Sequence, residues 1–161
     1  MKNGTMWYDT DGKAYLFHSS NFNKTLYISA LNAEYTDVTG VYSPVMADQT
    51  REAPAPFYRN GTYYMITSGC TGWSPNAALF AICDNVFSGW RLIDNPCVGQ
   101  AFRKTFYGQS TYVFEENGTW YLMLDHWHPD DLRNSGYSIL PITFTQEGIE
   151  VHWQETFEGI S

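Results

Sequence analysis

Short apolar and aromatic runs alternate with turn residues along the whole chain. Three turns of the Asp-Gly or Asn-Gly type, at 11–12, 60–61 and 117–118, each separate two such runs. Because both central positions of these turns tolerate positive φ, each one predicts a β-hairpin. No helical period is sustained anywhere, and Gly and Pro interrupt the chain throughout, so we expect little helix.

Each hairpin belongs to a larger unit that recurs about every fifty residues. A third apolar run follows each hairpin, at 25–29, 77–82 and 137–141, and a shorter fourth one lies near 41–42, 90–92 and 151–153. Four antiparallel strands repeated in this way predict β-propeller blades, in units at about 1–45, 50–98 and 106–158. A β-sandwich is the competing all-β fold, but a hairpin at the same place in every unit favours blades. Closed propellers have roughly four to eight blades, so three units predict a partial propeller.

Composition and net charge limit the classes of binding partner that we expect. Aromatic residues make up 17% of the chain and charged residues 16%, so flat apolar rings are abundant both for a β core and for stacking on sugars. The net charge of −8 and the pI of about 4.7 argue against nucleic acid and anionic membranes, which attract basic proteins. No run is long enough for a membrane helix, and no signal peptide is visible at the N-terminus.

The cysteines and histidines give no metal pattern. Cys70, Cys83 and Cys97 form no Cys-x-x-Cys pair, and the spacing of His126 and His128 is not specific for a ligand pair. We therefore expect neither a metal nor another cofactor. Cys70 and Cys97 flank one unit and could pair in an exported protein; free thiols are the equal alternative.

Three polar residues stand at comparable places just before the hairpins. They are Asn3, Glu52 and Gln109 in the first, second and third units. Because the innermost strands of a propeller face its central channel, we expect these side chains to converge on one cavity. Glu52 is then a candidate general acid. The alternative interpretation is that Glu52 pairs with Arg51 or lies in solvent, as most charged residues do. Two prolines at 54 and 56 suit the start of a strand and not its centre.

Two loops after the hairpins carry indoles. Trp73 lies in the glycine-rich segment 68–76, and Trp127 lies in the segment 125–131 with carboxylates and imidazoles. Both rings could stack on sugar faces, and packing between blades is the equal alternative for each.

Six segments, in order along nearly the whole chain, together resemble glycoside hydrolase family 43, and within it the galactan 1,3-β-galactosidase (exo-β-1,3-galactanase)-like group. They are 9–16, 35–40, 51–55, 67–73, 107–111 and 125–127. The resemblance implies a five-bladed propeller of which this chain resembles the C-terminal three blades. It also implies an inverting glycosidase, whose two catalytic groups stand about 6.5–9.5 Å apart with room for one water.

Residue by residue, the resemblance implies a site. Glu52 matches the general acid, and Gln109 matches a glutamine proposed to replace the usual catalytic-base Asp, by an unusual tautomer or by positioning water. Asp125 and Trp127 match positions in the sugar pocket, and the matching segments add three further substrate-binding candidates, Arg51, Trp73 and Tyr107. Asn3 aligns with the Asp that tunes the acid in the family, but it carries no charge, and it is a further substrate-binding candidate.

The implied function is hydrolysis of O-glycosidic bonds in galactan or related plant polysaccharide side chains. The alternative is a non-catalytic carbohydrate-binding or structural remnant of such an enzyme. The resemblance also implies an oligo- or polysaccharide partner and a secreted or cell-surface parent enzyme. Open blade edges predict self-association, and we expect the chain alone to hydrolyse galactosides poorly or not at all.

Overall fold

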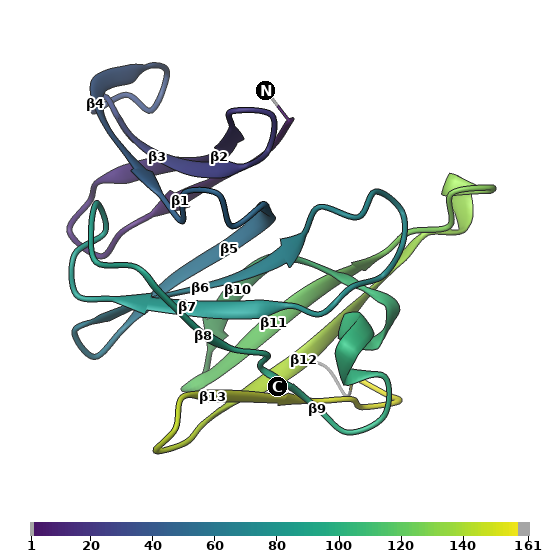
Figure 1. The fold of residues 1–161 in the computed structure, drawn as a ribbon. Coiled ribbons are helices and arrows are strands. Elements are labelled where there is room, and N and C mark those ends of the chain that lie inside the picture. Colours follow the sequence, from purple (N-terminus) through teal and green to yellow (C-terminus); the bar gives the residue numbers. More distant parts are fainter. Residues whose placement is uncertain (1, 158–161) are drawn as a thin grey trace.

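The computed structural model describes residues 2–157, and their side chains from Gly4 onward. Figure 1 shows three antiparallel sheets that follow one another in chain order. Within residues 2–157, helix is limited to two short 3-10 segments, η1 (Phe102–Tyr107) and η2 (Leu132–Asn134). The sequence prediction of an all-β partial propeller, with four-stranded blades and little helix, is confirmed.

The first two sheets have four strands each, in sequence order. The first contains β1 (Lys2–Tyr8), β2 (Ala14–Ser20), β3 (Thr25–Leu31) and β4 (Val38–Val45). The second contains β5 (Arg51–Arg59), β6 (Thr62–Gly69), β7 (Leu79–Cys83) and β8 (Arg91–Asp94).

The third sheet takes a strand from outside its own unit. It contains β10 (Gln109–Glu116), β11 (Thr119–His126), β12 (Gly136–Phe144) and β13 (Ile149–His152), and β9 (Cys97–Val98) pairs with β13 in parallel. Cys97, which the repeat assigns to the second unit, therefore joins the third sheet. All three cysteines are free thiols, which leaves Cys70 and Cys97 unpaired.

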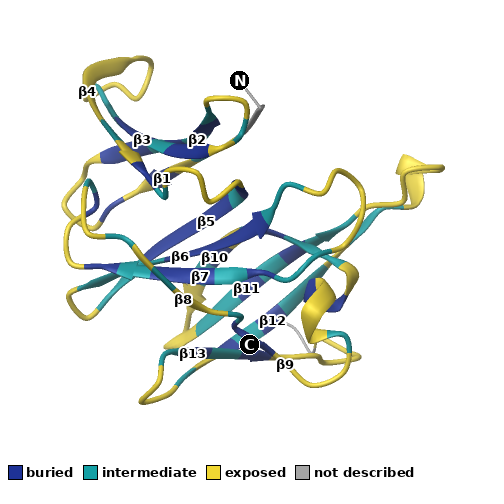
Figure 2. Cartoon of the chain, in the orientation of Figure 1, coloured by how far each residue is buried: buried dark blue, intermediate teal, exposed yellow. Residues whose placement is uncertain are grey.

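The core lies between neighbouring sheets, as the dark blue strand centres in Figure 2 show. One apolar cluster joins the first sheet to the second, and the other joins the second to the third. Representative members are Phe17, Leu26, Ile28 and Met65 in the first cluster, and Phe57, Ile66, Leu122 and Leu140 in the second. Each of these side chains is at most 1% exposed, and burial of one such side chain stabilises the fold by about 1.5–3 kcal/mol.

The innermost strands β1, β5 and β10 share one irregularity. Each is an edge strand, and each has a register shift near its start, between Lys2 and Gly4, between Glu52 and Ala55, and between Ser110 and Tyr112. A bulge re-aims the neighbouring side chain and is frequent beside active sites. The same device therefore recurs where the sequence predicts the converging polar residues.

The prolines of β5 correct one sequence expectation. Pro54 and Pro56 lie inside the strand that begins at Arg51, and not at its start. Pro54 falls in the bulge, and β5 pairs only with β6. A strand with one unpaired edge tolerates residues that lack an amide donor, which explains their position.

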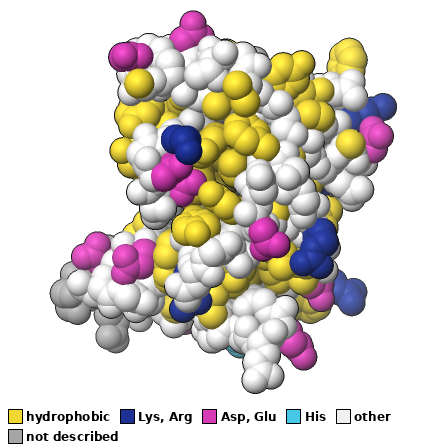
Figure 3. All heavy atoms as spheres, turned by 90° about the vertical axis from the view of Figure 1, so that its left-hand side faces the viewer, with side chains coloured by type: hydrophobic (Ala, Val, Ile, Leu, Met, Phe, Trp, Pro, Cys, Tyr) yellow, Lys and Arg dark blue, Asp and Glu magenta, His cyan; other side chains and the backbone are white. Residues whose placement is uncertain are grey.

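The first sheet leaves apolar side chains exposed on β1 and β4, among them Met6, Tyr8, Val41 and Tyr42. Figure 3 shows apolar side chains gathered in the upper part of the side it views. Among the described residues, no helix has the length and apolar character needed to span a membrane.

Candidate active site

Glu52 and Gln109 meet at the inner ends of the second and third sheets. The Gln109 Nε2 donates a hydrogen bond to the Glu52 Oε1 at 3.2 Å, although 57 residues separate them. Glu52 is 8% exposed and Gln109 is half-buried. Ala53, next to Glu52, has a φ of 50° within the bulge, which turns the chain beside the carboxylate. The structure thus brings together two of the three residues expected to converge, whereas the side chain of Asn3 lies outside the described residues.

Arg51 is buried beside this pair, and its guanidinium makes hydrogen bonds within the fold. Its Nε donates to the Thr67 Oγ1 at 2.9 Å and its Nη2 to the Thr67 carbonyl at 2.7 Å, with a longer contact to the Ala77 carbonyl at 3.5 Å. Burial lowers the pKa of the guanidinium to about 10, so it stays charged at neutral pH. These contacts fasten β5 to β6 and to the chain before β7. A substrate contact by Arg51 stays a prediction.

Cys70 lies near the candidate acid, a placement that the sequence did not predict. Its thiol donates a hydrogen bond to the Asn23 carbonyl, with 3.8 Å between sulfur and oxygen. Burial, together with the nearby Glu52 carboxylate, raises the pKa of the thiol to about 11, so it stays protonated at neutral pH. The sequence offered only one signal, the position of Cys70 directly after β6 in a matched segment.

Asn76 and Thr105 hold two segments of the site together, and the sequence did not predict this role for either residue. The Asn76 side chain closes the loop after β6 by accepting from the Gly69 amide at 2.8 Å and donating to the Gly69 carbonyl at 3.0 Å. The buried Thr105 hydroxyl donates to the Asn76 carbonyl and accepts from the Ala78 amide, both at 2.7 Å. Together they connect the loop that carries Trp73 to the η1 segment that precedes Gln109.

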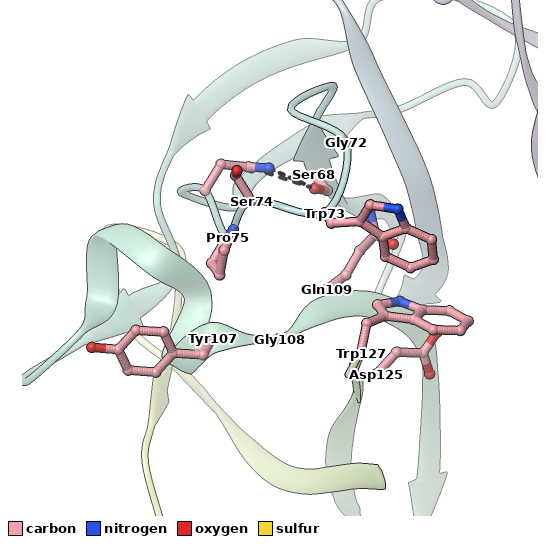
Figure 4. Close-up of a pocket in the computed structure, with 11 residues that line it drawn as sticks. Ser68, Gly72, Trp73, Ser74, Pro75, Tyr107, Gly108, Gln109, Asp125 and Trp127 are labelled. Atoms are coloured by element: carbon pink, nitrogen blue, oxygen red, sulfur yellow. Dashed lines mark hydrogen bonds between the residues drawn. The ribbon is translucent and has the colours of Figure 1, made fainter. Parts of the chain in front are cut away.

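A polar pocket opens next to Gln109, and two tryptophans stand over it (Figure 4). The rings of Trp73 and Trp127 meet edge to face, with centroids 5.6 Å apart and planes at 66°. They are 61% and 46% exposed, so the described residues do not bury either ring, and stacking on sugar faces stays a prediction. The lining residues are Ser68, Gly72, Trp73, Ser74, Pro75, Asn76, Tyr107, Gly108, Gln109, Asp125 and Trp127. The cavity volume is about 50 Å³, well below the roughly 300–1,000 Å³ of typical ligand sites.

Tyr107 contributes to the pocket differently from the tryptophans. It belongs to the lining, but in Figure 4 its ring points away from Gln109 and from both indoles. Thr105, Phe106 and Tyr107 all have positive φ, between 50° and 66°, and this turn swings the ring outward. A substrate contact by Tyr107 therefore stays a prediction.

Asp125 supplies a carboxylate from the neighbouring strand. It lies opposite Gln109 in the β10–β11 register. Burial raises its pKa, and a hydrogen bond from Thr111 opposes the rise. His126, next along the strand, has a pKa lowered by burial, and its Nε2 lies 2.7 Å from the Ser138 Oγ. Among the described residues, no three His, Cys, Asp or Glu side chains are grouped so as to hold a metal ion.

Solved structures similar to this chain are glycosidases. A β-1,3-galactosidase of family GH43, solved with galactodeoxynojirimycin, is 42% identical with a TM-score of 0.93, over 96% of this chain and 46% of that one. An exo-β-1,3-galactanase from Clostridium thermocellum is 31% identical with a TM-score of 0.83, over 92% of this chain and 33% of that one. An exo-β-1,3-galactanase from Phanerochaete chrysosporium, solved with β-1,3-galactotriose, is 26% identical with a TM-score of 0.84, over 92% and 35%.

The chain therefore spans less than half the length of these relatives. A search of curated proteins found no match. Family GH43 neighbours are five-bladed propellers, and the three sheets correspond to part of such a propeller. The family profile described as "Glycosyl hydrolases family 43" matches residues 4–149, and the chain belongs to this family.

Proposed function

We propose that this chain carries part of the active site of an inverting glycoside hydrolase that acts on β-1,3-linked galactan, with Glu52 as its general acid. The observation that carries the proposal is the contact between the buried Glu52 and Gln109 beside the Trp73–Trp127 pocket. The substrate class is supported by the similar structures, which are named as β-1,3-galactosidases and exo-β-1,3-galactanases.

In this mechanism Glu52 protonates the glycosidic oxygen as its bond to the anomeric carbon breaks, while Gln109 orients the water that attacks that carbon from the opposite face. The attacking water releases its second proton to solvent as the new C–O bond forms. Gln109 is suited to positioning because its amide can donate an N–H to the carboxylate or, after turning, accept from the protonated acid. Inverting enzymes separate their two catalytic groups by about 6.5–9.5 Å. The Gln109 Nε2–Glu52 Oε1 distance of 3.2 Å is shorter than this range, so the proposal requires the two side chains to separate when substrate binds.

The pocket offers both contacts that a pyranose needs. An indole face covers the apolar C–H face of a sugar, and Trp73 and Trp127 keep much of their rings exposed. Asp125 adds a carboxylate that can accept hydrogen bonds from hydroxyl groups. The cavity of about 50 Å³ does not enclose a sugar by itself. We therefore expect slow or undetectable hydrolysis by the isolated chain.

The first test is hydrolysis of β-1,3-galactotriose, arabinan and xylan oligomers, with the anomer of the product followed by NMR. The matched variants are Glu52→Gln and Glu116→Gln, the second at an exposed position on β10. A general acid contributes about 10²–10⁴-fold, so Glu52→Gln should remove that factor and Glu116→Gln should not. Galactoside turnover that survives Glu52→Gln would refute the assignment of the acid.

A binding measurement tests the proposal when hydrolysis by the chain is too slow to detect. Galactodeoxynojirimycin carries a basic nitrogen, which pairs with a carboxylate when protonated. We expect calorimetry to show binding to the wild type and to Glu116→Gln, and a loss of at least about tenfold in Glu52→Gln. Equal binding by all three proteins would place the cationic sugar away from Glu52. Binding without any hydrolysis that is equally strong in Glu52→Gln would favour the carbohydrate-binding remnant. Self-association through open blade edges and a secreted or cell-surface parent enzyme stay predictions.

A further inference from the structure

A second cavity lies on the other side of Tyr107 and has no part in the proposed reaction. It is formed by two segments, the chain around η1 and the chain after β13. The lining residues are Gln100, Ala101, Phe106, Tyr107, Trp153 and Glu155. Its volume of about 290 Å³ lies near the lower end of the range for ligand sites and far above that of the Trp73–Trp127 pocket.

Trp153 is held in a fixed orientation although it is 40% exposed. Its Nε1 donates to the Glu155 Oε1 at 2.8 Å. The His126 ring meets it edge to face at 6.1 Å between centroids, and the Phe106 ring lies against it at 5.8 Å. An exposed indole that is fixed from three directions loses little entropy when a ligand stacks on it.

The backbone on the opposite side of this cavity is strained. Ala101, Phe106 and Tyr107 have φ values of 60°, 54° and 66°, a region that side-chain-bearing residues rarely adopt. The conformation buries Phe106 to 4% exposure and leaves Tyr107 59% exposed. Such strain persists only where surrounding contacts enforce it, and here the buried Thr105 hydroxyl supplies them. The result is an exposed tyrosine and an exposed tryptophan on one cavity.

We infer that this cavity is a second carbohydrate subsite, which takes a neutral pyranose residue of the same polysaccharide outside the reaction pocket. The inference rests on the proposed function and extends its substrate contacts. Aromatic faces with polar groups at their rim, here Gln100 and Glu155, match a sugar with its apolar face and hydroxyl edge. The Glu155 carboxylate and the net charge of −8 disfavour an acidic sugar. Tyr107 lines both cavities, so the two adjoin at this residue.

The test follows the six tryptophan indole N–H signals of the full chain by NMR during titration with β-1,3-galactotriose. Trp153→Phe identifies the Trp153 signal, and Trp90→Phe is the matched substitution away from both cavities. We expect a saturable shift of the Trp153 signal at millimolar ligand. Trp153→Ala and Tyr107→Ala should each weaken binding at this cavity roughly fivefold or more. Cellotriose serves as the comparison sugar.

The outcomes separate this inference from the proposed function. If only the Trp73 and Trp127 signals move, the second subsite is refuted while the proposed active site still stands. If no indole signal moves at tens of millimolar galactotriose, the second subsite is likewise refuted, and the Glu52→Gln assays decide the active site separately. A shift of Trp153 in the wild type supports the subsite without depending on the folding of a variant. An equal shift with cellotriose supports a pyranose site that does not select galactose.

Discussion

The starts of β5 and β10 occupy equivalent places in neighbouring sheets and carry different chemistry. β5 begins Arg51-Glu52-Ala53, and β10 begins at Gln109 after Gly108 and continues with Ser110. Both strands are bulged edge strands, and the Ser110 Oγ donates to the Ala53 carbonyl at 2.7 Å. One scaffold position therefore presents a carboxylate in the second sheet and an amide in the third.

The partner strands reverse this arrangement. Glu52 pairs in register with Ser68 on β6, whereas Gln109 pairs with Asp125 on β11. The carboxylate of the second sheet is buried on the innermost strand, and that of the third sheet is half-buried one strand further out. The repeat thus fixes where polar side chains lie. Under the proposed mechanism, the residue at each place decides whether it donates a proton, orients water or holds a hydroxyl.

The two strand starts are also supported differently. Arg51 anchors β5 through hydrogen bonds to Thr67, whereas Gly108 lets β10 approach β11 closely. A β-carbon on Gly108 would lie 3.0 Å from the Leu124 Cβ and 3.2 Å from the Asp125 carbonyl oxygen. The start of β5 therefore depends on the buried Arg51 cation, and the start of β10 depends on Gly108 having no side chain.

The largest effect is expected from Arg51→Met. It removes two donors from the oxygens of the fully buried Thr67, and each buried acceptor left unsatisfied costs about 1–3 kcal/mol. The free energy of unfolding, measured in urea, should fall by about 2–4 kcal/mol, against less than about 0.5 kcal/mol for the exposed Arg133→Met. Unchanged stability together with lost sugar binding would instead make Arg51 a substrate contact.

A smaller loss is expected from Gly108→Ala. The added methyl group must push β10 away from β11, and overpacking of this kind costs about 1–3 kcal/mol. Gly136→Ala is the control, because no atom lies within 4 Å of its added methyl group and its φ is not positive. Urea unfolding of both variants measures the difference. Equal stabilities would show that β10 is not held by close approach at this point.

The smallest effect is a pH dependence in Asp125→Asn. Burial raises the pKa of Asp125 above its ordinary value of 3.8, so the folded protein binds this proton more tightly than the unfolded chain. Its contribution to stability is therefore present below pH 3.8 and is lost as pH rises through the raised pKa. The Tm of Asp125→Asn should exceed that of the wild type at pH 7, and the difference should shrink toward low pH.

Asp130→Asn, at an exposed position, is the control for this comparison. A difference in Tm that is the same at low and neutral pH would show that the proton on Asp125 does not matter to stability. It would remove the distinction between the half-buried carboxylate of the third sheet and an ordinary surface one.

Much of the fold was predictable because its signals are local. Asp-Gly and Asn-Gly turns with flanking apolar runs specify hairpins within a few residues, and their recurrence specifies blades. The pairing of Cys97 in the third sheet and the two prolines inside β5 were not predictable in this way. Both depend on which strand has a free edge, a property that exists only after the sheets have formed.

For the site, the sequence by itself determined the residue types and their place in the repeat: Glu52 and Gln109 before their hairpins, and Trp73 and Trp127 in the loops after them. Only the tertiary structure decided which of these side chains meet. It joined Glu52 to Gln109, turned Arg51 toward Thr67, swung the Tyr107 ring outward and placed Cys70 near the acid. The physical reason is that side-chain direction depends on bulges, positive φ values and the packing of neighbouring sheets, which residues distant in sequence set together.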